Sequence, residues 1–159
     1  MRICVIGGSG FLGSHVSDQL TKEGHHVCIY DRESSPWLQA GQTMVEGDLL
    51  DLERLEKAVS GADAVYNFAA LADLNVALNK PLQTVKINIL GNVQVLEACR
   101  RQSVKRFIYA STVYVYSREG GFYRCSKQAA ENYVEEYQKV YQLDYTILRY
   151  GSLYGPRSN

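Results

Sequence analysis

Short apolar runs alternate along the chain with longer segments in which apolar residues recur every three or four positions. This alternation is typical of repeated strand and helix units around a parallel sheet. Most of the runs are too apolar for a sheet with one face in water, so we expect strands that are covered on both faces. The strands are expected at residues 2–6, 26–30, 43–46, 64–68, 106–110 and 145–148.

Between these runs, the spacing of apolar residues predicts three amphipathic helices, and a fourth helix is expected from about Phe122 to Tyr141. Because no repeat, low-complexity tract or linker interrupts the pattern, one compact domain is expected to fill residues 1–159. The apolar faces of the first three helices hold Leu12, Val16 and Leu20, then Leu52, Leu55 and Val59, and then Leu82, Val85, Ile89, Val93 and Leu96.

Composition and charge narrow the functional classes. Seventeen Lys plus Arg balance seventeen Asp plus Glu, so no broad electrostatic surface for nucleic acid or anionic lipid is expected. No apolar stretch approaches the roughly 18 residues of a membrane span, and the chain opens on a strand-like run rather than a signal peptide. The four cysteines are widely spaced, with no CxxC pair and no neighbouring histidines, so packing thiols, no metal site and a cytoplasmic location are expected.

A glycine-rich turn follows the first predicted strand. Residues 7–13 read GGSGFLG and open the first helix. Glycines let the backbone turn tightly and approach a pyrophosphate, whose charge is met by free N–H groups at the positive end of the helix. Gly10 is expected to leave room for that approach, and Gly13 to let the helix lie close to the sheet. The motif predicts a dinucleotide site in a Rossmann-type, doubly wound α/β fold with helices on both faces.

The same glycine pattern can also connect a strand to a helix in a protein that binds no ligand at the turn. Asp31 favours the interpretation as a nucleotide-binding site. It closes the second strand, 18 residues after Gly13, where a carboxylate accepts hydrogen bonds from ribose hydroxyls. Because a carboxylate repels a 2′-phosphate, NAD is favoured over NADP. Arg32 follows and can in principle hold a 2′-phosphate, although a solvated loop arginine is the simpler interpretation.

Tyr123 and Lys127 form a YxxxK pair on one face of the last long helix. A tyrosine with an ordinary pKa of about 10 is a poor base at neutral pH, but a nearby ammonium group favours its phenolate. The chain has twelve tyrosines, so the pair alone is weak evidence. Ser111 and Thr112 strengthen it, because they stand at the carboxyl end of the fifth strand, where open α/β sheets bind their ligands.

Together these motifs resemble the extended short-chain dehydrogenase/reductase family, specifically its NAD-dependent nucleotide-sugar epimerases and dehydratases. The resemblance covers nearly the whole chain. Its matches, in order, are the GGSGFLG turn, Tyr30-Asp31, Gly47-Asp48-Leu49, Asn67 to Ala70, Asn88, Ala110 to Tyr116, Tyr123 to Lys127 and Arg149 to Pro156.

The resemblance implies a residue set for catalysis and for binding. Thr112, Tyr123 and Lys127 would be catalytic, and Thr112 and Ser152 would contact a nucleotide-sugar, with Ser152 standing where many relatives carry an asparagine. Asp48 and Leu49 would face the adenine, and Ser111 the nicotinamide side. The full set of implied NAD contacts is Gly7, Gly10, Phe11, Leu12, Gly13, Asp31, Arg32, Asp48, Leu49, Phe68, Ala69, Ala70, Asn88, Ser111, Tyr123, Lys127 and Tyr150.

The two residues after Thr112 help to distinguish between the epimerases and the dehydratases of the family. Dehydratases of the family carry an Asp-Glu pair there, because eliminating water needs a second acid and base, and the related decarboxylases carry a Glu nearby. This chain has Val113 and Tyr114 instead. Epimerisation needs no further acid or base, since the keto sugar turns over and takes the hydride back on its other face. The resemblance therefore implies a 4-epimerase that acts through a 4-keto sugar.

Two other functions remain open: a non-catalytic NAD-binding module that regulates a partner, and a reductase of the same superfamily that acts on a non-sugar carbonyl. Members of the family continue into a smaller C-terminal substrate domain, which is absent from these 159 residues, so we expect the N-terminal part of a longer enzyme. Relatives commonly dimerise through two long helices, here around residues 81–103 and 122–142, and a homodimer of this kind is expected.

Overall fold

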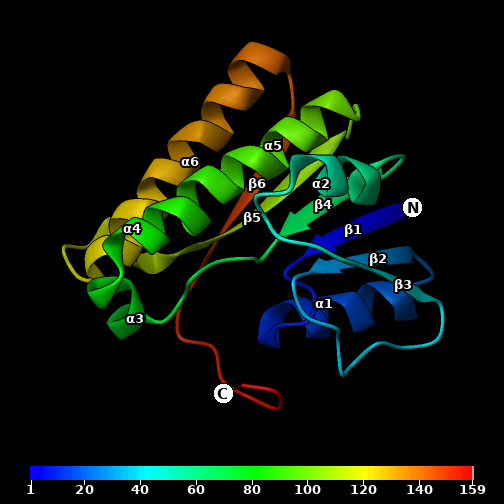
Figure 1. Cartoon of the computed structure of the whole chain (residues 1–159), viewed down its shortest axis with the longest axis horizontal. Coiled ribbons are helices and arrows are strands. Elements are labelled where there is room, and N and C mark those ends of the chain that lie inside the picture. Colours follow the sequence, from blue (N-terminus) through cyan, green and yellow to red (C-terminus); the bar gives the residue numbers. More distant parts are fainter. Residues whose placement is uncertain (159) are drawn as a thin grey trace.

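The computed structural model describes residues 1–158 and contains one parallel sheet (Figure 1). Its strands stand in the order β3-β2-β1-β4-β5-β6. The order reverses between β1 and β4, which confirms the doubly wound arrangement. All six predicted strands are present, and β5 and β6 run two residues further than predicted at their carboxyl ends. The strands are β1 (Arg2–Ile6), β2 (His26–Asp31), β3 (Gln42–Glu46), β4 (Ala64–Asn67), β5 (Arg106–Thr112) and β6 (Asp144–Tyr150).

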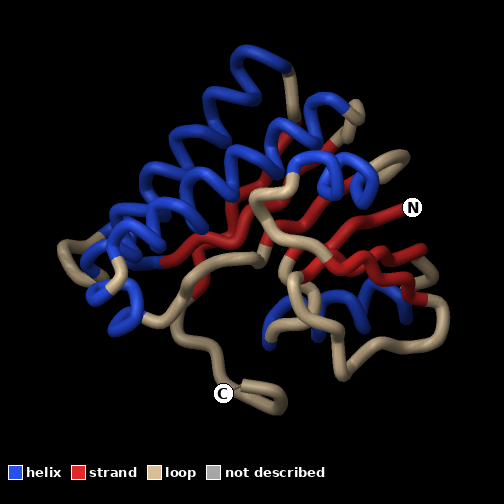
Figure 2. The backbone as a smooth tube through the Cα atoms, in the orientation of Figure 1, coloured by secondary structure: helices blue, strands red, loops and turns tan. Residues whose placement is uncertain are grey.

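Helices cover both faces of the sheet, as predicted (Figures 1 and 2). On one face, α1 (Phe11–Lys22) packs over a small cluster. On the other face, α2 (Leu52–Val59), α5 (Asn92–Arg101) and α6 (Gly121–Tyr141) pack over the larger core. The small cluster holds Ile3, Val5, Val27 and Ile29, and the larger core includes Ile6, Leu55, Val65, Leu96, Phe107 and Val134.

Small residues let α1 lie close to the sheet. Gly13, Ser14 and Ser17 are its buried positions, whereas the leucines and the valine predicted to form its apolar face are only half-buried. The Ser17 hydroxyl is satisfied because it donates to the carbonyl oxygen of Gly13 at 2.8 Å. In α2 the prediction is confirmed, since Leu55 and Val59 are buried.

The third predicted helix is a continuous helical run whose middle turns are π-helical. It passes from α4 (Pro81–Thr84) through η1 (Val85–Gly91) into α5. The predicted apolar face is wrong at its start, because Leu82 is 86% exposed and Val85 is 51% exposed. Asn88 is buried instead. A π turn holds more residues than an α turn, so the side of the helix that meets the core is rotated away from the apolar stripe.

Two short helical elements were not predicted from the spacing of apolar residues. In α3 (Leu74–Asn79), the side chain of Asp73 caps the helix by accepting a hydrogen bond from the Val76 N–H at 2.8 Å. The 3-10 helix η2 (Val113–Tyr116) directly follows β5. Both are too short to display an apolar period. Within residues 1–158, no helix is long and apolar enough to cross a membrane.

Candidate active site

The carboxyl ends of β1, β4 and β5 meet where the strand order of the sheet reverses. Open α/β sheets bind their ligands in the crevice at this point. The segment after β6 returns across this edge towards α1 (Figure 1), where the carbonyl oxygen of Pro156 lies 2.8 Å from Nε2 of His15. The fold therefore gathers the predicted site from segments far apart in the sequence.

Two glycines of the turn are required by the fold itself. Gly7 has a φ of +78°, and a Cβ there would lie 2.6 Å from the backbone nitrogen of Ala69. A Cβ on Gly13 would lie 2.2 Å from the carbonyl oxygen of Gly7. Side chains at these positions would collide with backbone, so the predicted close approach of α1 at Gly13 is confirmed.

Gly10 differs because the protein does not crowd it. Its φ is −76°, and a Cβ there would meet only the carbonyl oxygen of Gly7, at 3.4 Å. Gly10 is the N-cap of α1, and no side chain caps the N–H groups of the first turn, which begins with Phe11 and Leu12. Open space before free donors is what a pyrophosphate needs. The residues of the turn thus fit a dinucleotide such as NAD.

Asp31 ends β2 and lies against the glycine turn. Its Oδ2 accepts a hydrogen bond from the Ser9 N–H at 3.0 Å. Arg32 turns outward, because its side chain is 74% exposed and pairs with Glu33 at 3.2 Å. This arrangement matches a solvated loop arginine and leaves the Asp31 carboxylate beside the turn, where a ribose hydroxyl of NAD would lie.

The segment after β4 packs beside the turn. The backbone of Phe68 and Ala69 lies against Gly7, and the Ala69 N–H donates to Oδ1 of Asn67 at 3.2 Å. Ala70 follows and is half-buried. The three predicted contacts on this segment therefore lie at the same strand ends as the glycine turn.

Asp48 and Leu49 belong to the loop after β3. The Tyr30 hydroxyl donates to the carbonyl oxygen of Asp48 at 2.7 Å, which ties this loop to β2. Leu49 is buried against η1, since its Cδ2 would lie 2.3 Å from a Cβ on Gly91. Their contact with adenine stays a prediction.

The side-chain amide of Asn88, in η1, forms hydrogen bonds within the protein. Its Oδ1 accepts from the Leu71 N–H at 2.7 Å, and its Nδ2 donates to the Leu71 carbonyl oxygen at 3.1 Å and to Oγ of Ser126 at 2.9 Å. Ser126 directly precedes Lys127 on α6. Asn88 therefore ties the segment after β4 to the helix that carries the predicted catalytic pair, and its contact with NAD stays a prediction.

Lys127 reaches from α6 to the end of β5. It is 2% exposed, and its Nζ donates to the carbonyl oxygen of Ala110 at 2.6 Å. The same nitrogen lies 4.7 Å from the ring centroid of Tyr109 and 5.7 Å from that of Tyr123. Burial lowers the pKa of Lys127 to about 7, and the negative charge of Glu131 partly offsets this effect.

Tyr123 stands one turn before Lys127 on α6, as the spacing predicts. Its pKa is raised, first by burial and then by Tyr114. The expected preference for the phenolate is therefore wrong for the chain as it stands. The reason is that burial of the phenol disfavours its charged form. The protonated form of Lys127, whose Nζ lies 5.7 Å from the centroid of the Tyr123 ring, is the positive charge that favours the phenolate.

A buried acid that the sequence analysis missed organises the ends of β5 and β6. Glu131 follows Lys127 by one turn and is 6% exposed. Its Oε1 accepts from the Ser111 hydroxyl at 2.5 Å and from Nε of Arg149 at 3.0 Å, and its Oε2 accepts from Nη2 of Arg149 at 2.7 Å. The Ser111 hydroxyl, expected on the nicotinamide side, thus donates to Glu131. The spacing of Glu131 from Lys127 was the one available signal.

The remaining predicted residues lie at or after the ends of β5 and β6. Thr112 is 5% exposed, and its Oγ1 accepts from the Tyr114 N–H at 3.3 Å. Tyr150 is its partner in the register of the two strands, and burial raises the pKa of that tyrosine. Ser152 is exposed in the segment after β6. The structure brings Thr112 and Tyr150 together and leaves Ser152 at the surface.

Comparison with known proteins decides the family. The model of the NAD dependent epimerase/dehydratase family matches residues 3–159. The chain belongs to this family. NAD is accordingly the cofactor of this epimerase/dehydratase domain, in agreement with the open space at Gly10 and the position of Asp31. The individual contacts with NAD and the catalytic roles stay predictions.

Relatives of this epimerase/dehydratase domain act on different carbonyl and sugar compounds. The UDP-glucose 4-epimerase of Klebsiella pneumoniae is 34% identical over 128 residues, which cover 73% of this chain and 92% of that protein. The 2-alkyl-3-oxoalkanoate reductase of Stenotrophomonas maltophilia is 36% identical over 119 residues, which cover 74% of this chain and 35% of that protein.

A solved structure is similar over the whole domain. The UDP-glucose 4-epimerase of Thermotoga maritima with UDP-glucose gives a TM-score of 0.93 at 32% identity, and the match covers 100% of this chain and 58% of that one. The chain spans about half the length of most curated relatives that it matches.

Proposed function

We propose that this chain forms the NAD-binding part of a nucleotide-sugar 4-epimerase that acts through a 4-keto sugar. The observation that carries the proposal is the hydrogen bond from Lys127 to the carbonyl oxygen of Ala110. This bond holds a buried amine close to the Tyr123 ring and near the carboxyl end of β5, whose last residue is Thr112. An amine, a phenol and a hydroxyl at one strand end form a set suited to moving the proton of a sugar alcohol.

Each residue has its own role in the proposed reaction. The Thr112 hydroxyl holds the oxygen on the sugar C4, and Tyr123 removes the proton from that oxygen and later gives it back. Lys127 stabilises the negative charge on the Tyr123 oxygen whenever that oxygen is deprotonated. NAD, when bound, would be held by the glycine-rich turn beside Asp31 and would supply the hydride-transfer chemistry at C4.

The residues after Thr112 support epimerisation over dehydration. Val113 is 46% exposed, and Tyr114 follows it in η2. Neither side chain is a carboxylate that could serve as the second acid or base of an elimination. The epimerase needs only the proton-transfer set already described.

A reductase of the same superfamily is the second candidate function. Its support is the 36% identity to a 2-alkyl-3-oxoalkanoate reductase over 74% of the chain. The two functions differ in their redox balance, because a reductase consumes NADH with every turnover and an epimerase regenerates its NAD. A purely regulatory NAD-binding module has no use for the residue set of Thr112, Tyr123 and Lys127, which disfavours that alternative.

The test uses the complete gene product that carries this chain, with NAD and UDP-glucose, the sugar nucleotide named for the relatives. Proton NMR should detect the C4 epimer without net formation of NADH. Tyr123→Phe should abolish turnover while NAD affinity stays within a few fold. Tyr133→Phe, which alters a phenol that is 47% exposed on the same helix, should leave turnover unchanged. Steady oxidation of NADH with a carbonyl substrate, and no epimer, would favour the reductase.

A homodimer through residues 81–103 and 122–142 also stays a proposal. Its support is the number of large apolar side chains that these helices leave in water, among them Leu82, Val85 and Phe122, which are 86%, 51% and 48% exposed. Sedimentation equilibrium measures the assembly directly, and Leu82→Glu should shift it to monomer. A cytoplasmic location likewise stays a prediction.

A further inference from the structure

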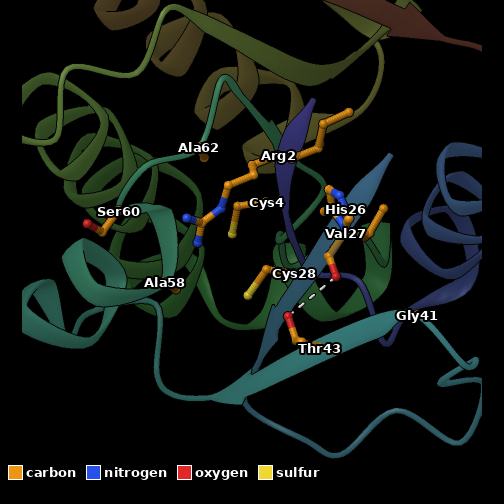
Figure 3. Close-up of a pocket in the computed structure, with 11 residues that line it drawn as sticks. Arg2, Cys4, His26, Val27, Cys28, Gly41, Thr43, Ala58, Ser60 and Ala62 are labelled. Atoms are coloured by element: carbon orange, nitrogen blue, oxygen red, sulfur yellow. Dashed lines mark hydrogen bonds between the residues drawn. The ribbon is translucent and has the colours of Figure 1, made fainter. Parts of the chain in front are cut away.

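A cavity of about 270 Å³ opens beside the amino-terminal halves of β1, β2 and β3, next to the end of α2 (Figure 3). Its lining includes Arg2, Cys4, Cys28, Thr43 and Ser60. None of its lining residues belongs to the predicted cofactor or catalytic set. Whatever chemistry it supports is therefore separate from the epimerase site, and does not rest on the proposed function.

Two thiols meet in this cavity. Cys4 and Cys28 are direct neighbours in the register of β1 and β2, and their side chains lie next to each other (Figure 3). Both thiols line the cavity. Adjacent strands lie about 4.8 Å apart, which is within the span of roughly 4.4–6.8 Å between Cα atoms that a disulfide bridges.

The two thiols differ in exposure and in charge. Cys4 is fully buried, whereas Cys28 is half-buried. The neighbouring Cys4 thiol lowers the pKa of Cys28, and Thr43 and the positive charge of Arg2 add to this effect against the opposing effect of burial. The neighbouring Cys28 and burial raise the pKa of Cys4. Besides the two thiols, the ionisable side chains that line the cavity are the bases Arg2 and His26, so no lining carboxylate opposes a thiolate at Cys28.

We propose that Cys4 and Cys28 form a peroxide-sensitive thiol pair, in which Cys28 is oxidised first and Cys4 then closes a disulfide. In the first step, the Cys28 thiolate attacks a peroxide oxygen, so that an S–O bond forms and the O–O bond breaks. The sulfur loses two electrons to the peroxide, and the released hydroxide takes up a proton as water.

In the second step, the Cys4 sulfur attacks the Cys28 sulfenic acid. An S–S bond forms, the S–O bond breaks, and the leaving hydroxide departs as water with the proton of the Cys4 thiol. Two thiols and one hydrogen peroxide thus give one disulfide and two water molecules. The buried Cys4 needs no access to peroxide, because it lies directly beside Cys28 in the register of β1 and β2.

Other uses of the cavity and other cysteines fit less well. Over residues 1–158, no group of three or more His, Cys, Asp or Glu side chains could hold a metal ion, so a thiolate metal site lacks ligands. Cys99 is fully buried, and burial raises its pKa, so it is a poor target for peroxide. Cys125 is exposed on α6, away from this cavity, and serves as an internal reference.

The first test needs no variant. The purified protein is treated with hydrogen peroxide, the remaining thiols are alkylated after unfolding, and the peptides are mapped by mass spectrometry. The expected result is a linked pair of Cys4 and Cys28 peptides that a dithiol separates again, with Cys99 and Cys125 alkylated. Oxidation of Cys125 while Cys4 and Cys28 are both alkylated would overturn the proposal.

The order of the two steps is tested with serine variants. In Cys4→Ser, a sulfenic acid should persist at Cys28 and be trapped by a cyclic 1,3-dione, because the second sulfur is missing. Cys28→Ser should give neither the sulfenic acid nor the disulfide, and Cys125→Ser should behave as the native sequence. A dione adduct on Cys4 in the Cys28→Ser protein would contradict the assigned order.

A measurement on the native sequence covers the case in which a variant does not fold. At pH 6.5, iodoacetamide should alkylate Cys28 roughly tenfold faster than the exposed Cys125, because the thiolate is the reacting form. An equal or slower rate at Cys28 would overturn the assignment of Cys28 as the reactive thiol.

Discussion

Lys127 donates a hydrogen bond of 2.6 Å to the carbonyl oxygen of Ala110, and both residues are buried. An amine removed from water loses hydration that one carbonyl group only partly replaces, which is why burial lowers the pKa of Lys127 to about 7. The contact ties α6 to the end of β5. It also makes the protonation of Lys127 sensitive to the charges around it.

The first prediction concerns the pH dependence of stability. The pKa of Lys127 is about 7 in the folded chain and about 10.4 in an unfolded one. Between these values the unfolded chain binds the additional proton, so Lys127 makes the free energy of unfolding rise with pH. From pH 7 to pH 10, the stability of the native chain should therefore increase relative to Lys127→Met, by up to about 4 kcal/mol. Urea denaturation at several pH values measures this difference.

Lys139→Met is the matched control, because Lys139 lies on the same helix and its side chain is 75% exposed. Its stability difference from the native chain should stay flat over the same pH range. A flat difference for Lys127→Met as well would show that Lys127 keeps an ordinary pKa.

The second prediction concerns Glu131 as a positioning residue. Glu131→Gln keeps the shape of the side chain but removes the charge that pairs with Arg149 and supports the protonated form of Lys127. The free energy of unfolding should fall by roughly 2 kcal/mol. The pKa of Lys127 should fall further, which NMR titration of the lysine side chain detects. Glu136→Gln, which alters an exposed carboxylate paired with Lys139, should change neither quantity appreciably. An unchanged pKa of Lys127 in Glu131→Gln would show that Glu131 has only a structural role.

The third prediction distinguishes two glycines of the glycine-rich turn. Gly13→Ala puts a Cβ 2.2 Å from a backbone oxygen and should cost roughly 1–3 kcal/mol of stability. Gly10→Ala meets only one atom at 3.4 Å in the protein, so the chain should stay about as stable as the native one. NAD affinity should nevertheless drop strongly in Gly10→Ala, because the added methyl group occupies the approach to the helix N-terminus. Thermal denaturation and NAD titration test both variants. An unchanged NAD affinity in Gly10→Ala would show that the pyrophosphate does not bind at Gly10.

The fourth prediction concerns the choice of dinucleotide. Asp31→Ala should weaken binding of NAD more than binding of NADP, because the carboxylate accepts from a free ribose hydroxyl and repels a 2′-phosphate. Glu33→Ala, which removes the exposed partner of Arg32, is the control for general charge loss at this edge. Isothermal titration gives both dissociation constants. A constant ratio between them in Asp31→Ala would show that Asp31 does not read the ribose.

Features that depend on local chain properties were predictable from the sequence. The strands appear as apolar runs, and the turn at Gly7 and Gly13 appears because only glycine tolerates such close backbone contacts. The spacing of Tyr123 and Lys127 likewise places them one turn apart on α6.

Features that depend on tertiary contacts were not predictable in the same way. The partners of Glu131 are 20 and 18 residues away in the sequence, and nothing in its neighbourhood identifies them. The exposure of Leu82 and Val85 follows from π turns that a search for the helical period of 3.6 residues overlooks. The raised pKa of Tyr123 follows from burial, which a spacing argument does not contain.

In the proposed reaction, one site, with Tyr123 as its base, removes a hydride from C4 of a nucleotide-sugar and returns it there. The most direct test gives the complete gene product UDP-glucose that carries deuterium at C4, in ordinary water. NMR and mass spectrometry of the product should find the C4 epimer with its deuterium retained at C4, and no epimer with Tyr123→Phe. Replacement of the deuterium by solvent hydrogen, or full turnover in Tyr123→Phe, would contradict this reaction.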